Sequence, residues 1–221
     1  IITSSDINPR IDSWVFHEQI YTFGKSIPNM WIAVGEGENT ISYSRDSINW
    51  NGLGNEIFRT RGNNVCWNGK IWVAVGSGDN SIAYSHNGTI WTGLGQDIFI
   101  QGCAICWNGK LWLAGGHGMY KLAYSYDGMS WNGIESGHFL SSIHDISWNG
   151  TIWLAGGKKE SHKSTIIYSY NGFDWERTCA EDIFTVCNNI CWNGRLWIAV
   201  GEGNNTLAYS VNGFEWNGLG K

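Results

Sequence analysis

The chain has 221 residues, of which 43% are hydrophobic, 14% aromatic and 15% charged, and its formal net charge is −5 at pH 7. This length allows one large all-β domain, or two small domains, with a substantial core. The negative charge argues against nucleic acid as a partner, because a nucleic-acid-binding face is basic.

The N-terminal stretch IITSSDINPR has neither the basic nor the apolar region of a secretory signal. Residues 1–10 precede the first recognisable repeat residues, and we expect them to form a tail. No run of 18 or more apolar residues follows, and the sequence therefore predicts no membrane-spanning helix. Neither feature identifies the compartment, which stays open.

From there the chain repeats itself. A Trp before Ala-Val-Gly or Ala-Gly-Gly recurs every 40 to 44 residues, at Trp31, Trp72, Trp112, Trp153 and Trp197. Within one unit the alternation of apolar and polar residues predicts four strands, near 103–107, 110–115, 121–126 and 130–134. An Asn-Gly turn joins the first two, a Gly-rich loop the middle two, and an Asp-Gly turn the last two.

Four-stranded units of about 40 residues are typical of β-propellers, in which stacking around an axis buries both faces of each sheet. We therefore predict an all-β fold, a five-bladed β-propeller of four-stranded antiparallel blades. After the tail, residues 11–221 form a single domain, with repeats near 11–54, 55–95, 96–135, 136–178 and 179–221. A solenoid is the alternative, but neither terminus resembles a cap. Residues 12–16 match the link that precedes other repeats, so the ring is expected to close near the termini.

The turn between the third and fourth strands is the most regular element, as in LAYSYDGMSW (122–131). Its Y-S-x-[DN]-G-x-x-W pattern resembles the Asp-box, or bacterial neuraminidase, repeat of sialidases and many non-enzymatic propellers. It lacks one residue between Asp and Trp, and three copies have Asn instead of Asp. The resemblance implies a propeller and a structural role for the box. The box residues are Ser44, Asp46, Trp50, Ser85, Asn87, Trp91, Ser125, Asp127, Trp131, Ser169, Asn171, Trp175, Ser210, Asn212 and Trp216.

Three of the six cysteines share one repeat position, before Trp-Asn-Gly, where the fourth repeat has Ser147. A position that accepts Cys or Ser beside Trp predicts a small buried slot with a free thiol, and a disulfide between blades or a redox role is the alternative. Cys103 and Cys106 form a CxxC pair, but residues three apart on a strand point to opposite faces. We therefore expect no metal site and no cofactor.

The box turns all lie on one rim, so a binding face is expected on the other rim, where the loops vary between repeats. Its acidic residues would face the basic loop at 158–163, although solvated loops are also simply polar. The candidate ligand-binding residues of these loops are Glu36, Glu38, Asn39, Asp79, Asn80, His117, Tyr120, Glu202, Asn204 and Asn205. A second group at the start of the first strands comprises Asn64, Asp145 and Asn189, which suit sugar hydroxyls, an ion or channel water.

Catalysis is the weaker hypothesis. A sialidase-like site needs three converging Arg, and Arg45 and Arg195 lie on the wrong rim, which leaves too few partners. We therefore predict a non-enzymatic binding module that recognises glycans or small polar ligands in a lectin-like manner on the variable rim. A protein-interaction or structural propeller, for example in viral or cell-surface assembly, is the alternative, and a sialidase-like glycoside hydrolase is the second alternative.

Overall fold

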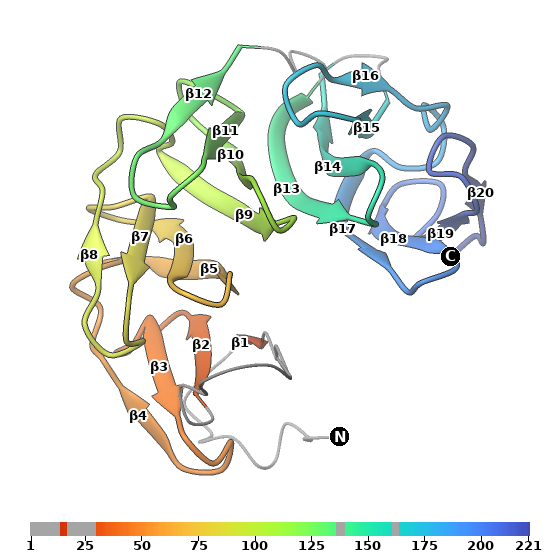
Figure 1. Ribbon diagram of the computed structural model, residues 1–221. Coiled ribbons are helices and arrows are strands. Elements are labelled where there is room, and N and C mark those ends of the chain that lie inside the picture. The colour runs from red at the N-terminus through yellow and green to blue at the C-terminus, as the bar shows by residue number, and fades with distance from the viewer. Residues whose placement is uncertain (1–13, 17–29, 136–139, 161–163) are drawn as a thin grey trace. The chain divides into compact units, whose positions relative to one another are not determined.

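The computed structural model describes residues 14–16, 30–135, 140–160 and 164–221, and these residues form antiparallel β-sheets throughout (Figure 1). The all-β prediction is therefore confirmed. The predicted N-terminal tail, and His162 and Lys163 of the predicted basic loop, lie outside the described residues. Contacts divide the chain into two compact units, Ile1–Gly102 and Cys103–Lys221, and each is described by itself.

The first unit contains two groups of four strands, and each group lies within one sequence repeat. We call each group a sheet, although the single pairs Ser77–Gln101 and Lys158–Val186 join groups into eight-stranded sheets. Sheet I consists of β1 (Trp14–Phe16), β2 (Trp31–Gly35), β3 (Ile41–Ser44) and β4 (Trp50–Gly52). Sheet II consists of β5 (Arg61–Trp67), β6 (Trp72–Ser77), β7 (Ile82–Ser85) and β8 (Thr92–Gly93).

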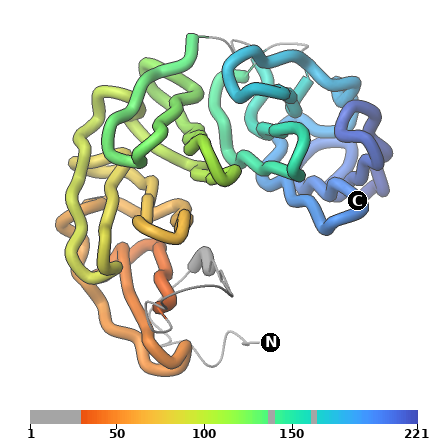
Figure 2. The backbone as a smooth tube through the Cα atoms, viewed as in Figure 1, coloured from red at the N-terminus to blue at the C-terminus, as the bar shows by residue number. Residues whose placement is uncertain are grey.

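The second unit contains three further sheets of the same construction, and Figure 2 follows the chain through their strands. Sheet III consists of β9 (Gln101–Trp107), which begins at the end of the first unit, β10 (Trp112–His117), β11 (Leu122–Ser125) and β12 (Asn132–Ile134). Sheet IV consists of β13 (Leu140–Trp148), β14 (Trp153–Lys159), β15 (Ile166–Ser169) and β16 (Glu176–Arg177). Sheet V consists of β17 (Val186–Trp192), β18 (Trp197–Glu202), β19 (Leu207–Ser210) and β20 (Asn217–Gly218).

One sequence expectation is wrong for the first sheet. Residues 12–16 were expected to form a link, but Trp14–Phe16 is the first strand of sheet I, with Trp14 opposite Gly35 and Phe16 opposite Ala33. The match to other links rested on residue types alone. Backbone pairing decides the assignment, because a strand is defined by the neighbour that satisfies its N–H and C=O groups.

The Asn-Gly turns between first and second strands have a local physical cause. The Oδ1 atom of Asn108 accepts hydrogen bonds from the N–H groups of Lys110 (2.9 Å) and Leu111 (2.8 Å). Gly109 has a φ of 97°, a conformation that glycine adopts without a Cβ clash. Asn68, Asn149 and Asn193 make the same pair of bonds in sheets II, IV and V. Asn therefore fixes the turn, and Gly permits it.

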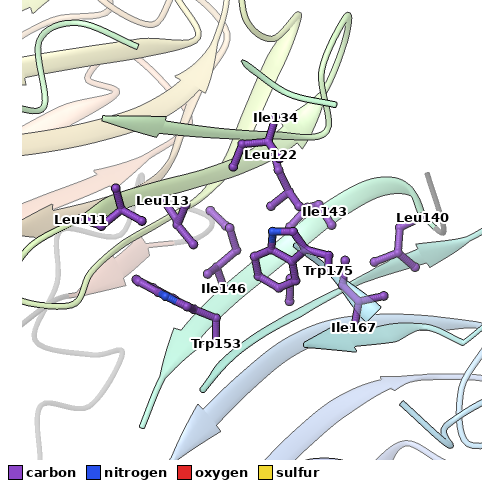
Figure 3. Close-up of a cluster of buried hydrophobic side chains, with 12 residues drawn as sticks. Leu111, Leu113, Leu122, Ile134, Leu140, Ile143, Ile146, Trp153, Ile167 and Trp175 are labelled. Atoms are coloured by element: carbon purple, nitrogen blue, oxygen red, sulfur yellow. The ribbon is translucent and has the colours of Figure 1, made fainter. Parts of the chain in front are cut away.

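The cores lie between the faces of successive sheets within each unit. In the second unit, Leu111 and Leu113 of sheet III pack with Ile146 and Trp153 of sheet IV (Figure 3). A second cluster joins Leu154 and Ile166 of sheet IV to Trp197 of sheet V. The first unit repeats the pattern, since Ile32 and Val34 of sheet I pack with Trp67 and Trp72 of sheet II. The large Trp side chains thus supply much of the apolar area that holds one sheet on the next.

Candidate functional site

The box turns bind their own backbone. Asp127 Oδ1 accepts hydrogen bonds from the N–H groups of Met129 (2.8 Å) and Ser130 (2.7 Å), and Ser125 Oγ accepts one from Gly128 N (2.7 Å). Trp131 Nε1 donates to the carbonyl of Gly128 at 3.1 Å. Asp46, Asn87, Asn171 and Asn212 accept the same two backbone bonds. These polar groups are occupied internally, which leaves them little capacity for a ligand.

Electrostatics agree with this local role. Backbone and side-chain hydrogen bonds from Asn49, together with the N–H of Ile48, hold the pKa of Asp46 well below its usual range. Burial alone would raise the pKa of Asp127, but the N–H groups of Ser130 and Met129 outweigh it and lower that pKa. Both carboxylates are therefore held ionised as hydrogen-bond acceptors.

A second set of side-chain hydrogen bonds to the backbone was not predicted from the sequence. The Oδ1 atom of Asn80 accepts a hydrogen bond from Gly95 N (2.9 Å), and its Nδ2 donates to the carbonyl of Ile57 (2.9 Å). A Cβ on Gly93 would lie 2.2 Å from the Asn80 side chain, so glycine is needed beneath it. Asn39 and Asn205 repeat the bond to a glycine N–H. The recurring Asn, followed by Gly 13 and 15 positions later, was the available signal.

In this arrangement, polar atoms of three predicted ligand-binding residues are occupied by hydrogen bonds to the backbone. The amide oxygens of Asn39, Asn80 and Asn205 each serve a backbone N–H, and two of the amide nitrogens serve a carbonyl. In sheet III, the ring of Tyr120 packs over Gly133, as the Asn80 side chain packs over Gly93 in sheet II. Asn204 donates to the carbonyl of Asp182 at 3.4 Å.

The predicted acidic residues of the first unit are matched by arginine. Arg61 Nη1 lies 2.9 Å from Glu36 Oε1, and Arg59 Nη2 lies 3.0 Å from Asp79 Oδ2. All four side chains are substantially exposed, so each pair adds little stability, but each lowers the local negative charge. Two of the arginines that a sialidase-like site could have used, Arg59 and Arg61, are thus engaged with carboxylates. Glu38 and His117 are exposed at the surface of the loops.

The first strands of sheets II, IV and V each contain a β-bulge at the same repeat position. The register shifts lie between Gly62 and Asn64, between Ile143 and Asp145, and between Cys187 and Asn189. The extra residues at the bulges are Asn63, His144 and Asn188. A bulge redirects side chains that regular alternation would place elsewhere, and bulges often lie beside functional sites.

In the second unit the bulges gather a polar group that we call the His144 cluster, defined as Ser142, His144, Lys158, Asn188 and Glu202. Ser142 Oγ lies 2.9 Å from His144 Nε2, and the side chain of Asn188 hydrogen-bonds His144. Lys158 and Glu202 both act on the His144 ring through their charges. The cluster combines Glu202, which the sequence assigns to the acidic loops, and Lys158 of the basic loop with His144 and Asn188, the neighbours of the predicted Asp145 and Asn189.

Burial lowers the pKa of His144, against the opposing effects of Asn188 and Glu202 and with the help of Lys158. The imidazole is therefore neutral at pH 7 and offers one donor and one acceptor. Ser142 is half-buried, whereas Lys158, Asn188 and Glu202 are exposed. The cluster thus presents hydroxyl, amide, imidazole, ammonium and carboxylate groups from adjacent strands.

Asp145, the neighbour of His144, is placed differently. Its side chain is 7% exposed, and its Oδ2 accepts the N–H of Ile190 in β17 at 2.8 Å. Burial raises its pKa to about 7, although hydrogen bonds from Ile190 and Ile146 oppose the shift. Asp145 therefore joins sheets IV and V through a buried hydrogen bond. Asn189 is exposed, and Asn64 Oδ1 is buried without a hydrogen-bond partner.

Within the described parts of the chain, no three His, Cys, Asp or Glu side chains come together in a way that could hold a metal ion. The same residues contain no helix of the length and apolarity that a membrane crossing requires.

Cys187 is buried and Cys179 and Cys191 are exposed, each as a free thiol.

No model of a known protein family matches the chain, and no curated protein sequence matches it. Solved structures do. The chain is similar to one from a nidogen–laminin complex, with a TM-score of 0.64 and 8% identity over 86% of this chain and 74% of that one. It is similar to the GH74 enzyme of Niastella koreensis, with a TM-score of 0.61 and 16% identity over 87% of this chain and 30% of that one.

The computationally designed protein Ika8 gives a TM-score of 0.56 and 11% identity over 85% of this chain and 56% of that one. The chain thus spans about a third of the GH74 enzyme and little more than half of the designed protein. These matches are to β-propeller proteins, and they show the fold alone. The chain has a β-propeller fold. The predicted β-propeller fold is therefore confirmed.

Proposed function

We propose that this propeller is a non-enzymatic binding module that recognises glycans or small polar ligands in a lectin-like manner. The site is the His144 cluster, on the rim opposite the box turns. The observation that carries the proposal is the contrast between the two rims. Box and Asn-Gly side chains are consumed by backbone hydrogen bonds, whereas the cluster holds exposed donors and acceptors beside a neutral imidazole.

The mixture of groups favours sugar hydroxyls. Each hydroxyl both donates and accepts, so it is best met by neighbouring donors and acceptors. Asn188 and Ser142 supply both functions, Glu202 accepts and Lys158 donates. Arg59 and Arg61 form ion pairs with Asp79 and Glu36, which is why we favour binding over sialidase-like catalysis.

We further propose that sheets I–V are the five blades of one closed ring and that the shortened box is a variant of the Asp-box. Support comes from one face of sheet V. Val200 and Leu207 are 41% and 38% exposed, although Val75 and Ile82, at the same positions of sheet II, are buried. An apolar face of this kind needs a cover, and in sheets I, III and IV the face at these positions packs against the next sheet of the same unit.

The binding proposal is tested with a glycan array, followed by calorimetry on each glycan that binds. His144→Ala and Asn188→Ala should each weaken binding by about tenfold or more, because each removes hydrogen bonds from a partly buried polar group. His86→Ala is the matched control, since His86 is exposed on a box turn and should leave affinity unchanged. Failure of the folded protein to bind any glycan, or equal binding by all variants, contradicts the proposal.

The alternative, a protein-interaction or structural propeller, is favoured by a separate observation. Ile48 and Ile90, on the box turns of the first unit, are both more than 70% exposed. Exposed apolar side chains mark an interface when they belong to one contiguous patch, and this alternative assigns Ile48 and Ile90 to such a patch. This alternative expects a protein partner that Ile48→Ser and Ile90→Ser release in a pull-down, with indifference to glycans.

A further inference from the structure

Aromatic side chains line the box rim of the second unit, away from the His144 cluster. Tyr126 and Tyr170 occupy the same position in successive repeats, between the Ser and the Asp or Asn of the box, and they are 67% and 63% exposed. Each contacts the tyrosine two residues earlier at near-right angles, with ring centroids 5.8 Å apart for Tyr126–Tyr124 and 5.9 Å for Tyr170–Tyr168. The two exposed rings are thus presented alike.

The inner rings are held in turn by the next sheet. Tyr124 packs edge-on against Phe173 with centroids 4.9 Å apart, and Tyr168 packs against Phe214 at 4.7 Å. Both phenylalanines belong to box turns, which are fixed by backbone hydrogen bonds to Asn171 and Asn212. The support is therefore rigid, and a ligand that stacks on Tyr126 or Tyr170 orders little of the protein.

A polar side chain stands directly across from each inner tyrosine. Asn132 is paired with Tyr124, and Glu176 with Tyr168, in the antiparallel register of the third and fourth strands. Both are exposed. The Tyr168 hydroxyl donates a hydrogen bond to Glu176 Oε2. This bond, burial and the nearby charge of Glu176 raise the pKa of Tyr168 to about 12, and Tyr170 also contributes to the shift. The phenol is therefore neutral, and Tyr168, Tyr170 and Glu176 lie together.

We propose that Tyr126 with Asn132, and Tyr170 with Glu176, form two equivalent subsites that each bind a pyranose unit of a neutral glycan chain. The aromatic ring stacks on the C–H face of a sugar, and the amide or carboxylate accepts a hydrogen bond from a hydroxyl. The inference does not rest on the His144 cluster. Ser169, at the box end of β15, is paired with Trp153, whereas His144 lies beside Gly156 and Gly157 at the opposite ends of the strands.

The pattern favours a glycan over a protein partner. A stable protein interface needs a contiguous, well-packed apolar core. Here each exposed ring packs on an inner tyrosine that is paired with an exposed polar side chain on the neighbouring strand, which suits the adjacent C–H and hydroxyl surfaces of sugars. Each subsite alone is small, so affinity should rise with chain length as both subsites are filled.

Calorimetry with hexasaccharides of cellulose, laminarin and mannan, beside the matching monosaccharides, tests this inference. We expect at least one hexasaccharide to bind much more tightly than its monosaccharide. Tyr126→Ala and Tyr170→Ala should each weaken binding about tenfold or more, and the double variant should abolish it. His144→Ala should have no effect, which separates this surface from the site under "Proposed function".

Sheet V supplies both a control and a gain-of-function variant. Val211 holds the position of Tyr126 and Tyr170, is exposed, and lies two residues after Tyr209, which is paired with Asn217. Val211→Ala should leave binding unchanged, whereas Val211→Tyr should add a third subsite and tighten binding of the hexasaccharide severalfold. Wild-type affinity in the folded Tyr126→Ala/Tyr170→Ala variant overturns the inference. So does the absence of binding to every hexasaccharide, or a protein partner that alone depends on these tyrosines.

Discussion

Ser47 occupies the box position that the other four repeats give to glycine. Its φ is 62°, and the glycines at this position have φ between 75° and 85°. A side chain in this left-handed region is strained by about 1–2 kcal/mol, whereas glycine adopts it freely but loses more entropy on folding. In the first box, the N–H groups of Ile48 and Asn49 therefore donate their hydrogen bonds to Asp46 from a strained turn.

Ser47→Gly is accordingly expected to raise the free energy of unfolding by roughly 0.5–1 kcal/mol, measured by urea denaturation. The reverse change, Gly172→Ser, serves as the control. Gly172 has a φ of 85°, and a Cβ there would approach Leu111 Cδ2 to 2.9 Å, so this variant should lose about 1–3 kcal/mol. Unchanged or lower stability of Ser47→Gly would show that its turn is not strained.

Strands and turns could be predicted because they depend on neighbours in sequence. Asn108-Gly109 and the box around Asp127 act through backbone groups two or three residues away, so their patterns suffice. The hydrogen bond between Asn80 and Gly95 spans 15 residues, and its sequence signal is visible only when the repeats are compared. The role of Asp145 depends on Ile190, 45 residues on, and Trp14 is paired with Gly35, which is also distant in the sequence. Such contacts are set by packing, which local pattern does not encode.

At the scale of elements, Asp145 makes the contact between sheets IV and V depend on pH. Its folded-state pKa is raised to about 7 from the ordinary 3.8, because burial disfavours the carboxylate. The folded protein thus binds a proton that the unfolded chain releases between these values. The stabilisation is fully present below about pH 4 and is lost as pH rises towards 7.

Asp145→Asn removes this dependence and keeps an oxygen that can accept the Ile190 N–H. Asn also stands at this position in sheets II and V, as Asn64 and Asn189. Urea denaturation between pH 5 and 8 should show the variant gaining roughly 2–4 kcal/mol relative to wild type as pH rises. Asp182→Asn, an exposed carboxylate in the second unit, is the control and should shift little. Parallel curves for wild type and Asp145→Asn would show that the carboxyl titrates normally.

For the whole molecule, the question is what covers the apolar face of sheet V. Val200 and Leu207 of sheet V are exposed, whereas the residues at the same positions of sheets I and II, such as Val34 and Val75, are buried. If the ring closes, sheet I covers this face, and a charge introduced there is buried without a partner. Val200→Asp should then lower the free energy of unfolding by about 2–4 kcal/mol. Val211→Asp, on an exposed turn of the same sheet, should change it by less than about 0.5 kcal/mol.

Sedimentation velocity distinguishes the possible covers. A closed ring predicts a compact monomer at every protein concentration, with the destabilised Val200→Asp variant also monomeric. A concentration-dependent dimer that Val200→Asp dissociates would assign the face to a second copy of the chain. Equal stability of wild type and Val200→Asp would leave the face in solvent and contradict closure. The size of the stability loss in Val200→Asp distinguishes a covered face from an exposed one. The free-energy costs of a buried unpaired charge and of an exposed charge differ by several times the error of such measurements.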